Sequence, residues 1–131
     1  MKILSTLILL IFSVNSYAEI ISCIAKAQCS TLIGAGKFED KSECHTKNIK
    51  RGDLFFDLEK LELIGAKGTK VSDLQKINDD IYMTGNILIH NFSQDKKLLV
   101  SSIVETNAEN NENTAFMVTY KCSKVLPKYQ Q

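Results

Sequence analysis

Residues 21–29 read ISCIAKAQC, and their alternating pattern places Cys23 and Cys29 on one face. Such alternation predicts a β-strand. Six residues at about 3.3 Å each would then separate the two cysteines by roughly 20 Å. Because a disulfide requires Cα atoms within about 7 Å of each other, these two cysteines cannot pair together. Each must therefore pair with Cys44 or Cys122, the other cysteines of the chain.

An even set of four cysteines in a chain that we expect to be exported predicts two structural disulfides. The favoured pairing joins Cys23 with Cys122, on the first and last strands, and Cys29 with Cys44, which closes a short loop. The crossed pairing remains open. Each crosslink is expected to contribute about 3 to 5 kcal/mol by chain entropy. A zinc site that includes His45 is disfavoured, because the chain has no Cys-x-x-Cys pair.

Residues 1–18, MKILSTLILLIFSVNSYA, have the layout of a secretory signal peptide. Lys2 precedes an apolar run over residues 3–14, and small residues end the segment at Ala18. The run is shorter than the roughly 20 residues that span a bilayer. We therefore expect cleavage after Ala18, no stable transmembrane segment, and a single mature domain, residues 19–131, that is periplasmic or secreted.

Two alternatives to a soluble exported chain remain open. The first is a retained N-terminal anchor. The second is acylation of Cys23, because residues 20–23, IISC, loosely match the motif that precedes a lipidated cysteine in bacterial lipoproteins. That motif normally adjoins the apolar core, whereas the polar stretch 15–19 intervenes here, and acylation would leave an odd number of cysteines. The soluble form is therefore favoured.

Charge is balanced in the expected mature chain. The whole sequence has 16 basic and 15 acidic side chains, and cleavage removes Lys2. Binding to phosphate backbones requires clustered cations, so this balance argues against nucleic acid as a partner. The densest basic stretch, Lys47, Lys50 and Arg51, is typical of a solvated loop.

The C-terminal half carries the clearest strand patterns. DIYMTGNILIHNF, residues 80–92, alternates with two largely apolar faces, which predicts a central strand. The polar stretch 93–97 predicts a hairpin connection to a partner strand over 98–107, and the Asn-rich run 107–114 predicts an exposed turn. A third strand over 115–125 completes an antiparallel meander. Its predicted inward side chains are Phe116, Val118, Tyr120 and Cys122.

The N-terminal half is less regular. In residues 53–65 the alternation changes phase at Glu59-Lys60, which favours a bulged strand, with a helix as the alternative. Residues 69–80 have apolar side chains at helical spacing and predict a short helix. Residues 36–53 predict a polar loop held by Cys44. We therefore predict a mainly β domain, a small antiparallel barrel or sandwich of about five strands with one short helix.

No residue pattern predicts catalysis. The two histidines are His45, beside a cysteine expected to be oxidised, and His90, for which a position at the rim of a strand is the simplest explanation. Asp57 and Glu59 share a strand face that we expect to be solvated. We predict no catalytic residue, and a hydrolase that uses Asp57, Glu59 or His90 is the least favoured hypothesis.

A metal or cofactor is likewise not expected. Asn78, Asp79 and Asp80 offer oxygen ligands for calcium, but the spacing of a calcium-binding loop is absent, and a turn explains them.

The favoured function is a non-enzymatic binding protein whose loops, residues 36–53 and 107–114, contact another protein or a cell-envelope component. The alternative is a carrier that holds a small apolar ligand in a barrel cavity lined by residues 81–92. In outline the chain is also analogous to small periplasmic β-barrel proteins that inhibit host lysozymes, which adds inhibition of a host or competitor hydrolase as a further alternative. The sequence does not predict an oligomeric state.

Overall fold

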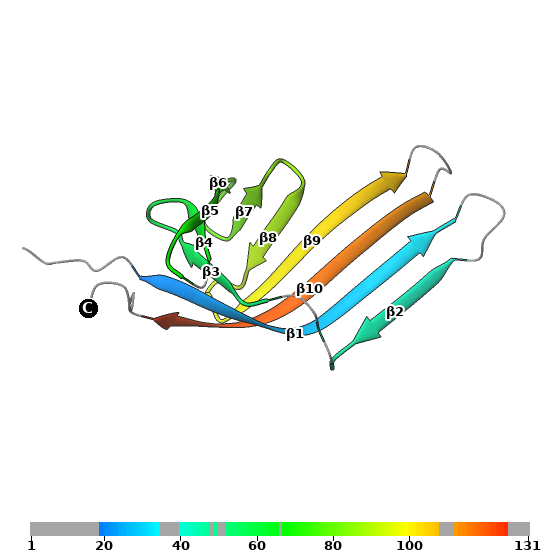
Figure 1. The fold of residues 1–131 in the computed structure, drawn as a ribbon, viewed down its shortest axis with the longest axis horizontal. Helices are drawn as coiled ribbons and strands as arrows, with labels where there is room; N and C mark the ends of the chain where they lie inside the picture. The colour runs from blue at the N-terminus through cyan, green and yellow to red at the C-terminus, as the bar shows by residue number, and fades with distance from the viewer. Residues whose placement is uncertain are drawn as a thin grey trace, which may run out of the picture.

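The computed structural model describes most of the expected mature domain as a single antiparallel sheet with no helix among its described residues (Figure 1). Residues 1–18, the predicted signal peptide, lie outside them. The described residues are 19–34, 40–47, 49, 52–65, 67–107 and 112–125.

Ten strands form the sheet in the order β5-β4-β3-β1-β10-β9-β8-β7-β6, with β2 paired to β1 off this path. Within the part of the chain that the structure describes, no helix has the length and hydrophobicity of a membrane span. The strands are β1 (Ile20–Ile33), β2 (Lys41–His45), β3 (Leu54–Asp57), β4 (Glu62–Ile64), β5 (Lys70–Asp73), β6 (Gln75–Lys76), β7 (Ile81–Thr84), β8 (Leu88–Phe92), β9 (Leu98–Asn107) and β10 (Glu112–Val125).

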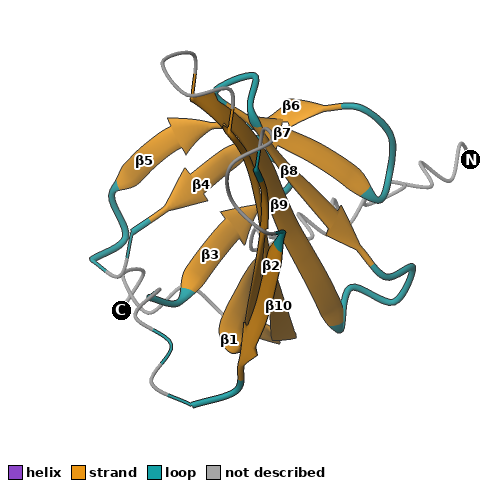
Figure 2. Ribbon diagram, turned by 90° about the vertical axis from the view of Figure 1, so that its right-hand side faces the viewer, coloured by secondary structure: helices purple, strands orange, loops and turns teal. Residues whose placement is uncertain are grey.

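The sheet rolls into a nearly closed barrel (Figure 2), because the two ends of the strand order follow one another in the chain. β5 pairs with β4, and β6 pairs with β7. Leu74 separates these two short strands, is buried, and donates its backbone N–H to the Leu61 carbonyl at 2.8 Å. The helix predicted over 69–80 is therefore wrong. Of the apolar residues at helical spacing only Leu74 is buried, since Val71 and Ile77 are 65% and 51% exposed.

Three long strands extend beyond the barrel (Figure 1). The far ends of β1, β10 and β9 continue with β2 as a projecting sheet, which we call the wing. The wing comprises β2 and residues 27–33, 102–107 and 112–117. None of the wing side chains that the structure describes is buried, so the hydrophobic core lies in the barrel alone.

Aromatic rings fill the centre of that core. Phe56 is fully buried, and its ring meets those of His90 and Phe92 edge-to-face, with centroids 5.1 and 5.2 Å apart. Tyr82 packs edge-to-face on Phe92 at 5.9 Å. Such pairs contribute about 0.5 to 1.5 kcal/mol beyond the burial of their area. The Cys23–Cys122 disulfide belongs to the same cluster.

A bulge at Lys26 changes which face of β1 each side chain occupies. Pairing with β10 passes from Ala25 opposite Tyr120 to Ala27 opposite Thr119, so Lys26 is the extra residue. An inserted residue shifts the alternation by one and exchanges the two faces.

Both disulfides of the favoured pairing form, Cys23–Cys122 and Cys29–Cys44, with Cα atoms 4.1 Å apart in each. Because of the bulge, Cys23 faces the barrel core, whereas Cys29 lies opposite Met117 on the outer face. The prediction that Cys23 and Cys29 share a face is therefore wrong.

Two predicted strands are hairpins. Residues 80–92 form β7 and β8, joined by a tight turn in which Gly85 and Asn86 have φ of 63° and 61°, as a type I′ hairpin requires. Residues 53–65 form β3 and β4, and the phase change at Glu59-Lys60 is the turn between them, not a bulge. The C-terminal meander therefore has four strands, β7 to β10, of which β9 and the extent of β10 over 115–125 were predicted correctly.

The predicted loops also contain strands. Residues 41–45 of the predicted loop 36–53 form β2, and residues 107 and 112–114 of the predicted turn belong to β9 and β10. Other parts of both segments, including 36–39 and 108–111, lie outside the described residues. The sheet has ten strands where about five were predicted, because β2, β5 and β6 are too short to carry a clear alternating pattern and two predicted strands are hairpins.

Candidate functional site

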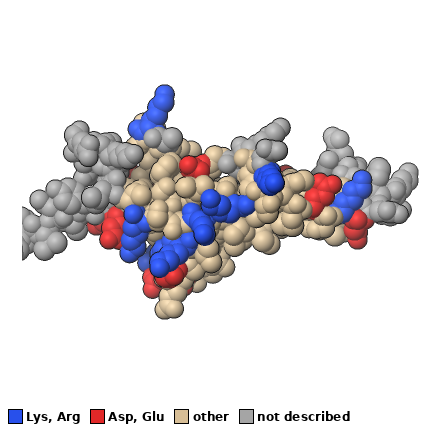
Figure 3. All heavy atoms as spheres, turned by 90° about the horizontal axis from the view of Figure 1, so that it is seen from below, with Lys and Arg blue, Asp and Glu red and all other residues tan. Residues whose placement is uncertain are grey.

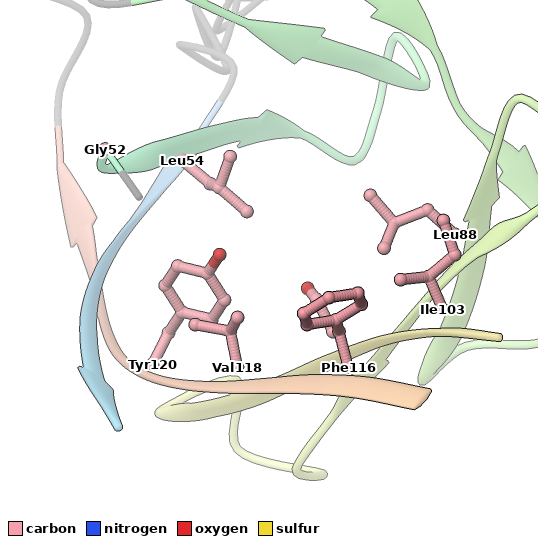
Figure 4. A pocket seen from close by; sticks show the side chains of 8 residues that line it. Gly52, Leu54, Leu88, Ile103, Phe116, Val118 and Tyr120 are labelled. Atoms are coloured by element: carbon pink, nitrogen blue, oxygen red, sulfur yellow. The ribbon is translucent and has the colours of Figure 1, made fainter. Parts of the chain in front are cut away.

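A pocket of about 320 Å³ opens on the inner face of the sheet, where the barrel meets the wing. This volume is at the lower end of the roughly 300 to 1,000 Å³ typical of small-molecule sites. Figure 4 shows apolar side chains from β3, β8, β9 and β10 converging on the space. The residues that line it are Gly52, Leu54, Leu88, Ser101, Ile103, Phe116, Val118 and Tyr120.

Unequal strand lengths create this pocket. The inward side chains of β10 include Tyr120 and Val118, which are 2% and 3% exposed, and Phe116, which is half-buried. β3 begins at Leu54 and β8 begins at Leu88, so neither strand continues over the inner face of the wing. The apolar face of β10 consequently extends past the strands that would cover it.

A buried polar chain reaches the pocket wall. His90 is fully buried, and its two ring nitrogens lie 2.7 Å from Ser101 Oγ and 2.8 Å from Thr84 Oγ1. Burial lowers the pKa of His90 to about 4, so the imidazole is neutral near pH 7. A neutral imidazole has one donor and one acceptor, and the two hydroxyl groups satisfy both. Of the three residues, Ser101 lines the pocket.

The Ser101–His90 contact lacks features that activate a serine nucleophile. In a Ser-His-Asp triad, a carboxylate orients the second ring nitrogen, whereas here a hydroxyl, that of Thr84, occupies that position. A pKa near 4 also makes the imidazole a weak base at neutral pH. The position predicted for His90, at an exposed rim, is wrong, because the ring faces the core beside Phe56.

The carboxylates singled out in the sequence lie in separate surroundings. Asp57 is buried, not solvated as predicted, and its Oδ1 accepts the backbone N–H groups of Glu59 and Lys60 at 3.1 and 2.9 Å, which caps the turn after β3. Glu59 is exposed. Neither carboxylate lines the pocket with Ser101.

The predicted turn at Asn78 is present, since its side-chain oxygen accepts the N–H groups of Asp80 and Ile81, both at 2.9 Å. Asp79 is ion-paired with Lys76 at 3.0 Å, which lowers the pKa of this carboxyl. Among the described residues, no three side chains of the His, Cys, Asp and Glu types are grouped so that they could hold a metal ion.

His45 is an exposed residue of β2, within 3.6 Å of Glu43, and lies in the wing, away from the pocket. Sequence reasoning identified Val118, Tyr120 and Phe116 as inward-facing but missed the pocket that they line. It also missed Ser101, whose one signal is a small polar residue between Leu99 and Ile103 on an otherwise apolar strand face.

No protein-family model, curated protein or solved structure matches this chain. The function of the protein is therefore inferred from its own residues.

Proposed function

We propose that the protein is an exported, non-enzymatic binding protein whose pocket holds a small apolar ligand. The observation that carries this proposal is the convergence of side chains from four strands on one open space (Figure 4). Export is supported by the pattern of residues 1–18 and by two disulfides, which persist in oxidising compartments.

The lining favours a neutral ligand with an apolar body. Six of the eight lining residues that the structure describes have large apolar or aromatic side chains, and none of these eight carries a charge. A charged ligand would lose its hydration here without a compensating partner, which is costly. Ser101, held by His90 at 2.7 Å, is a polar point on the wall that would orient one hydrogen-bonding group of the ligand.

Ligand binding can be tested with N-phenyl-1-naphthylamine, a neutral apolar probe whose fluorescence rises on transfer out of water. We expect saturable binding to the wild-type protein. Ile103→Asp places a carboxylate at the half-buried edge of the pocket and should weaken binding more than about tenfold. The control, Val71→Asp, makes a similar change at a site that is 65% exposed on β5 and outside the pocket.

A second variant separates pocket filling from charge. Leu88→Trp adds volume to the pocket without adding charge, and it should also reduce probe binding while leaving the circular dichroism spectrum unchanged. Absence of saturable binding to the wild-type protein, or equal binding by Ile103→Asp and Val71→Asp, would remove the proposed function. Native mass spectrometry of protein from its host would identify a co-purified ligand.

A second candidate function, contact with a cell-envelope component, is supported by half-exposed aliphatic side chains on the opposite face of the same sheet, among them Ile24 and Leu98. That face has no residue in common with the pocket.

A further inference from the structure

Four lysines line an open hollow of about 600 Å³ outside the barrel, beside the turn that joins β8 to β9. They are Lys96, Lys97, Lys121 and Lys124, and Asp95 is the one acidic residue of the lining. Figure 3, which views the molecule from below, shows the largest group of basic side chains on the left, with some acidic side chains beside them. A chain with nearly equal numbers of basic and acidic residues therefore concentrates positive charge in one place.

Two of these lysines form no ion pair within the described structure. Lys96 bonds to the Asp80 carboxylate, and Lys124 pairs with Glu19 at 3.2 Å. Lys97 and Lys121 form no ion pair with any described residue. These two lysines can therefore bind an anion in the hollow.

Asp95 offsets only part of the positive charge of the hollow, because the described lining has one carboxylate and four lysines. Its Oδ1 accepts the Ser93 hydroxyl at 2.7 Å and the Lys97 N–H at 3.0 Å. These hydrogen bonds also fix the backbone that carries Lys97.

Aliphatic side chains flank Lys121, one of the two lysines without an ion pair among the described residues. Ile24 and Leu98 lie directly opposite Lys121 on its two neighbouring strands, so the three form one row on the outer face. Ile24 is 48% exposed and Leu98 is 50% exposed. A lysine beside half-exposed aliphatic groups is the pattern of surfaces that meet the boundary between headgroups and acyl chains.

The same face continues along the wing without charge. At its outward positions stand Met117 and Val104, 48% and 67% exposed, among small or neutral residues. The outward positions of the wing on β1, β9 and β10 include no Asp, Glu, Lys or Arg, and none is aromatic: Ala27, Cys29, Thr31, Ile33, Ser102, Val104, Thr106, Asn113, Ala115 and Met117.

We propose that this outer face docks on a bilayer surface that carries anionic lipids. The lysines of the hollow bind the lipid headgroups, and Ile24 and Leu98 enter the boundary beside them. The face lies on the convex side of the bent strands β1 and β10 (Figure 1). Its row of one lysine between two aliphatic side chains matches the headgroups and acyl chains of an anionic bilayer surface, which favours a bilayer over an acidic protein partner.

The test is co-sedimentation of the oxidised protein with vesicles of phosphatidylcholine, with and without phosphatidylglycerol at about a third of the lipid. We expect binding only to the anionic vesicles, weakening as salt is raised. The variant K97Q/K121Q should weaken binding about 25-fold, since each lysine near an anionic surface contributes roughly fivefold. The variant I24S/L98S should weaken it at least fivefold.

The matched control is K60Q/K67Q, which removes two exposed lysines from the turns after β3 and β4 and should leave vesicle binding within twofold. Ile103→Asp, the pocket variant, should also bind vesicles normally, so the pocket and the docking face can fail separately. Equal binding to neutral vesicles, no binding, or equal loss in the K60Q/K67Q control would overturn the proposal.

Two further outcomes would assign the face to another occupant. If only K97Q/K121Q weakens binding and inorganic phosphate competes for it, the hollow is a site for free phosphate and the bilayer proposal falls. If sedimentation velocity shows a dimer that I24S/L98S dissociates, a second copy of the chain covers this face, and the bilayer proposal falls as well.

Discussion

The barrel and the wing share three long strands, yet among the described residues side chains are buried only in the barrel. On the inner face of β10, Tyr120 is 2% exposed in the barrel, whereas Phe116 towards the wing end is half-buried. Both residues are aromatic, so a loss of hydrophobicity along the strand does not explain the difference. The layer that covers a strand therefore decides its burial, and β3 and β8 do not extend over the wing.

The two disulfides allow this difference to be measured. Each joins residues that are directly opposite on neighbouring antiparallel strands, with Cα atoms 4.1 Å apart. Cys23–Cys122 lies in the packed core of the barrel, whereas Cys29–Cys44 lies on the unpacked wing. Removal of each bridge should therefore have a different effect on the free energy of unfolding.

Loss of the barrel bridge should have the largest effect. In the double variant Cys23→Ala/Cys122→Ala, the unfolded chain regains the freedom of a loop that spans 99 residues. The chain-entropy model gives about 5 kcal/mol for a loop of this size, a large share of the roughly 5 to 15 kcal/mol of a small domain. Urea unfolding of oxidised protein would measure it, and a loss below about 2 kcal/mol would show that the barrel does not depend on this bridge.

Truncation of Phe56, the central ring of the barrel core, should have the second largest effect on the free energy of unfolding. Phe56→Ala removes the side chain that meets both His90 and Phe92, and a buried Phe→Ala change costs about 3 to 5 kcal/mol. The control is Met117→Ala at a site on the wing that is 48% exposed, where a change within about 0.5 kcal/mol is expected. Equal losses in urea unfolding would contradict the division into a packed barrel and an unpacked wing.

The features that the sequence predicted correctly depend on long, regular patterns. β1, β9 and β10 each alternate over many residues. Because Cys23 and Cys29 are too far apart to bond to each other, one of them must bond to Cys122, which predicts that the first and last strands lie side by side. Period-2 alternation and disulfide geometry are local constraints, so they can be read without the fold.

Turns and bulges were missed because their signals are weak. Leu61 has a φ of 56°, but leucine is not a residue type that indicates a positive φ or a turn. At the other turn, the single glycine Gly85 was insufficient to divide an otherwise continuous apolar pattern. The bulge at Lys26 reverses the outward face of β1, yet the stretch ISCIAKAQC alternates without interruption. The positions of these turns and of the bulge are determined by pairing with neighbouring strands.

The pocket and the lysine hollow were beyond sequence reasoning for another reason. Each gathers residues that are distant in the chain: Leu54 with Tyr120 in the pocket, and Lys97 with Lys121 in the hollow. Composition showed only balanced charge, whereas the fold determines where that charge is concentrated.

Acidification should destabilise the barrel through His90. Because burial lowers its pKa to about 4, the unfolded state, with a pKa near 6.5, takes up a proton first as pH falls. The contribution of neutral His90 to the free energy of unfolding is fully present above about pH 6.5. It is lost progressively as the pH falls to about 4, and the total loss is about 3 kcal/mol. Urea unfolding across this range would measure the loss, and His90→Gln should flatten it.

His45→Gln is the control for that experiment, because His45 is exposed on the wing and its substitution should leave the pH dependence unchanged. If stability were constant between pH 6.5 and 4, or if His45→Gln flattened the curve as well, the buried neutral histidine would not be its source.

Loss of the wing bridge should have the smallest effect on global unfolding. In Cys29→Ala/Cys44→Ala, the unfolded chain regains the freedom of a loop that spans 15 residues, worth about 3 kcal/mol in the chain-entropy model. β2 has no buried side chain and pairs only with β1, so in the variant it should detach while the barrel remains folded. The folded state then regains most of the same freedom, and the free energy of global unfolding should fall by about 1 kcal/mol or less.

Hydrogen exchange distinguishes detachment of β2 from a direct loss of barrel stability. In the wing-bridge variant the amides of Lys41–His45 that bond to β1 should lose their protection, while those of β8 and of β10 around Tyr120 should keep theirs. A loss near 3 kcal/mol with β2 still protected would mean that the wing unfolds together with the barrel. The exposed sheet would then be held by contacts as strong as those of the core, and the contrast between the two regions would disappear.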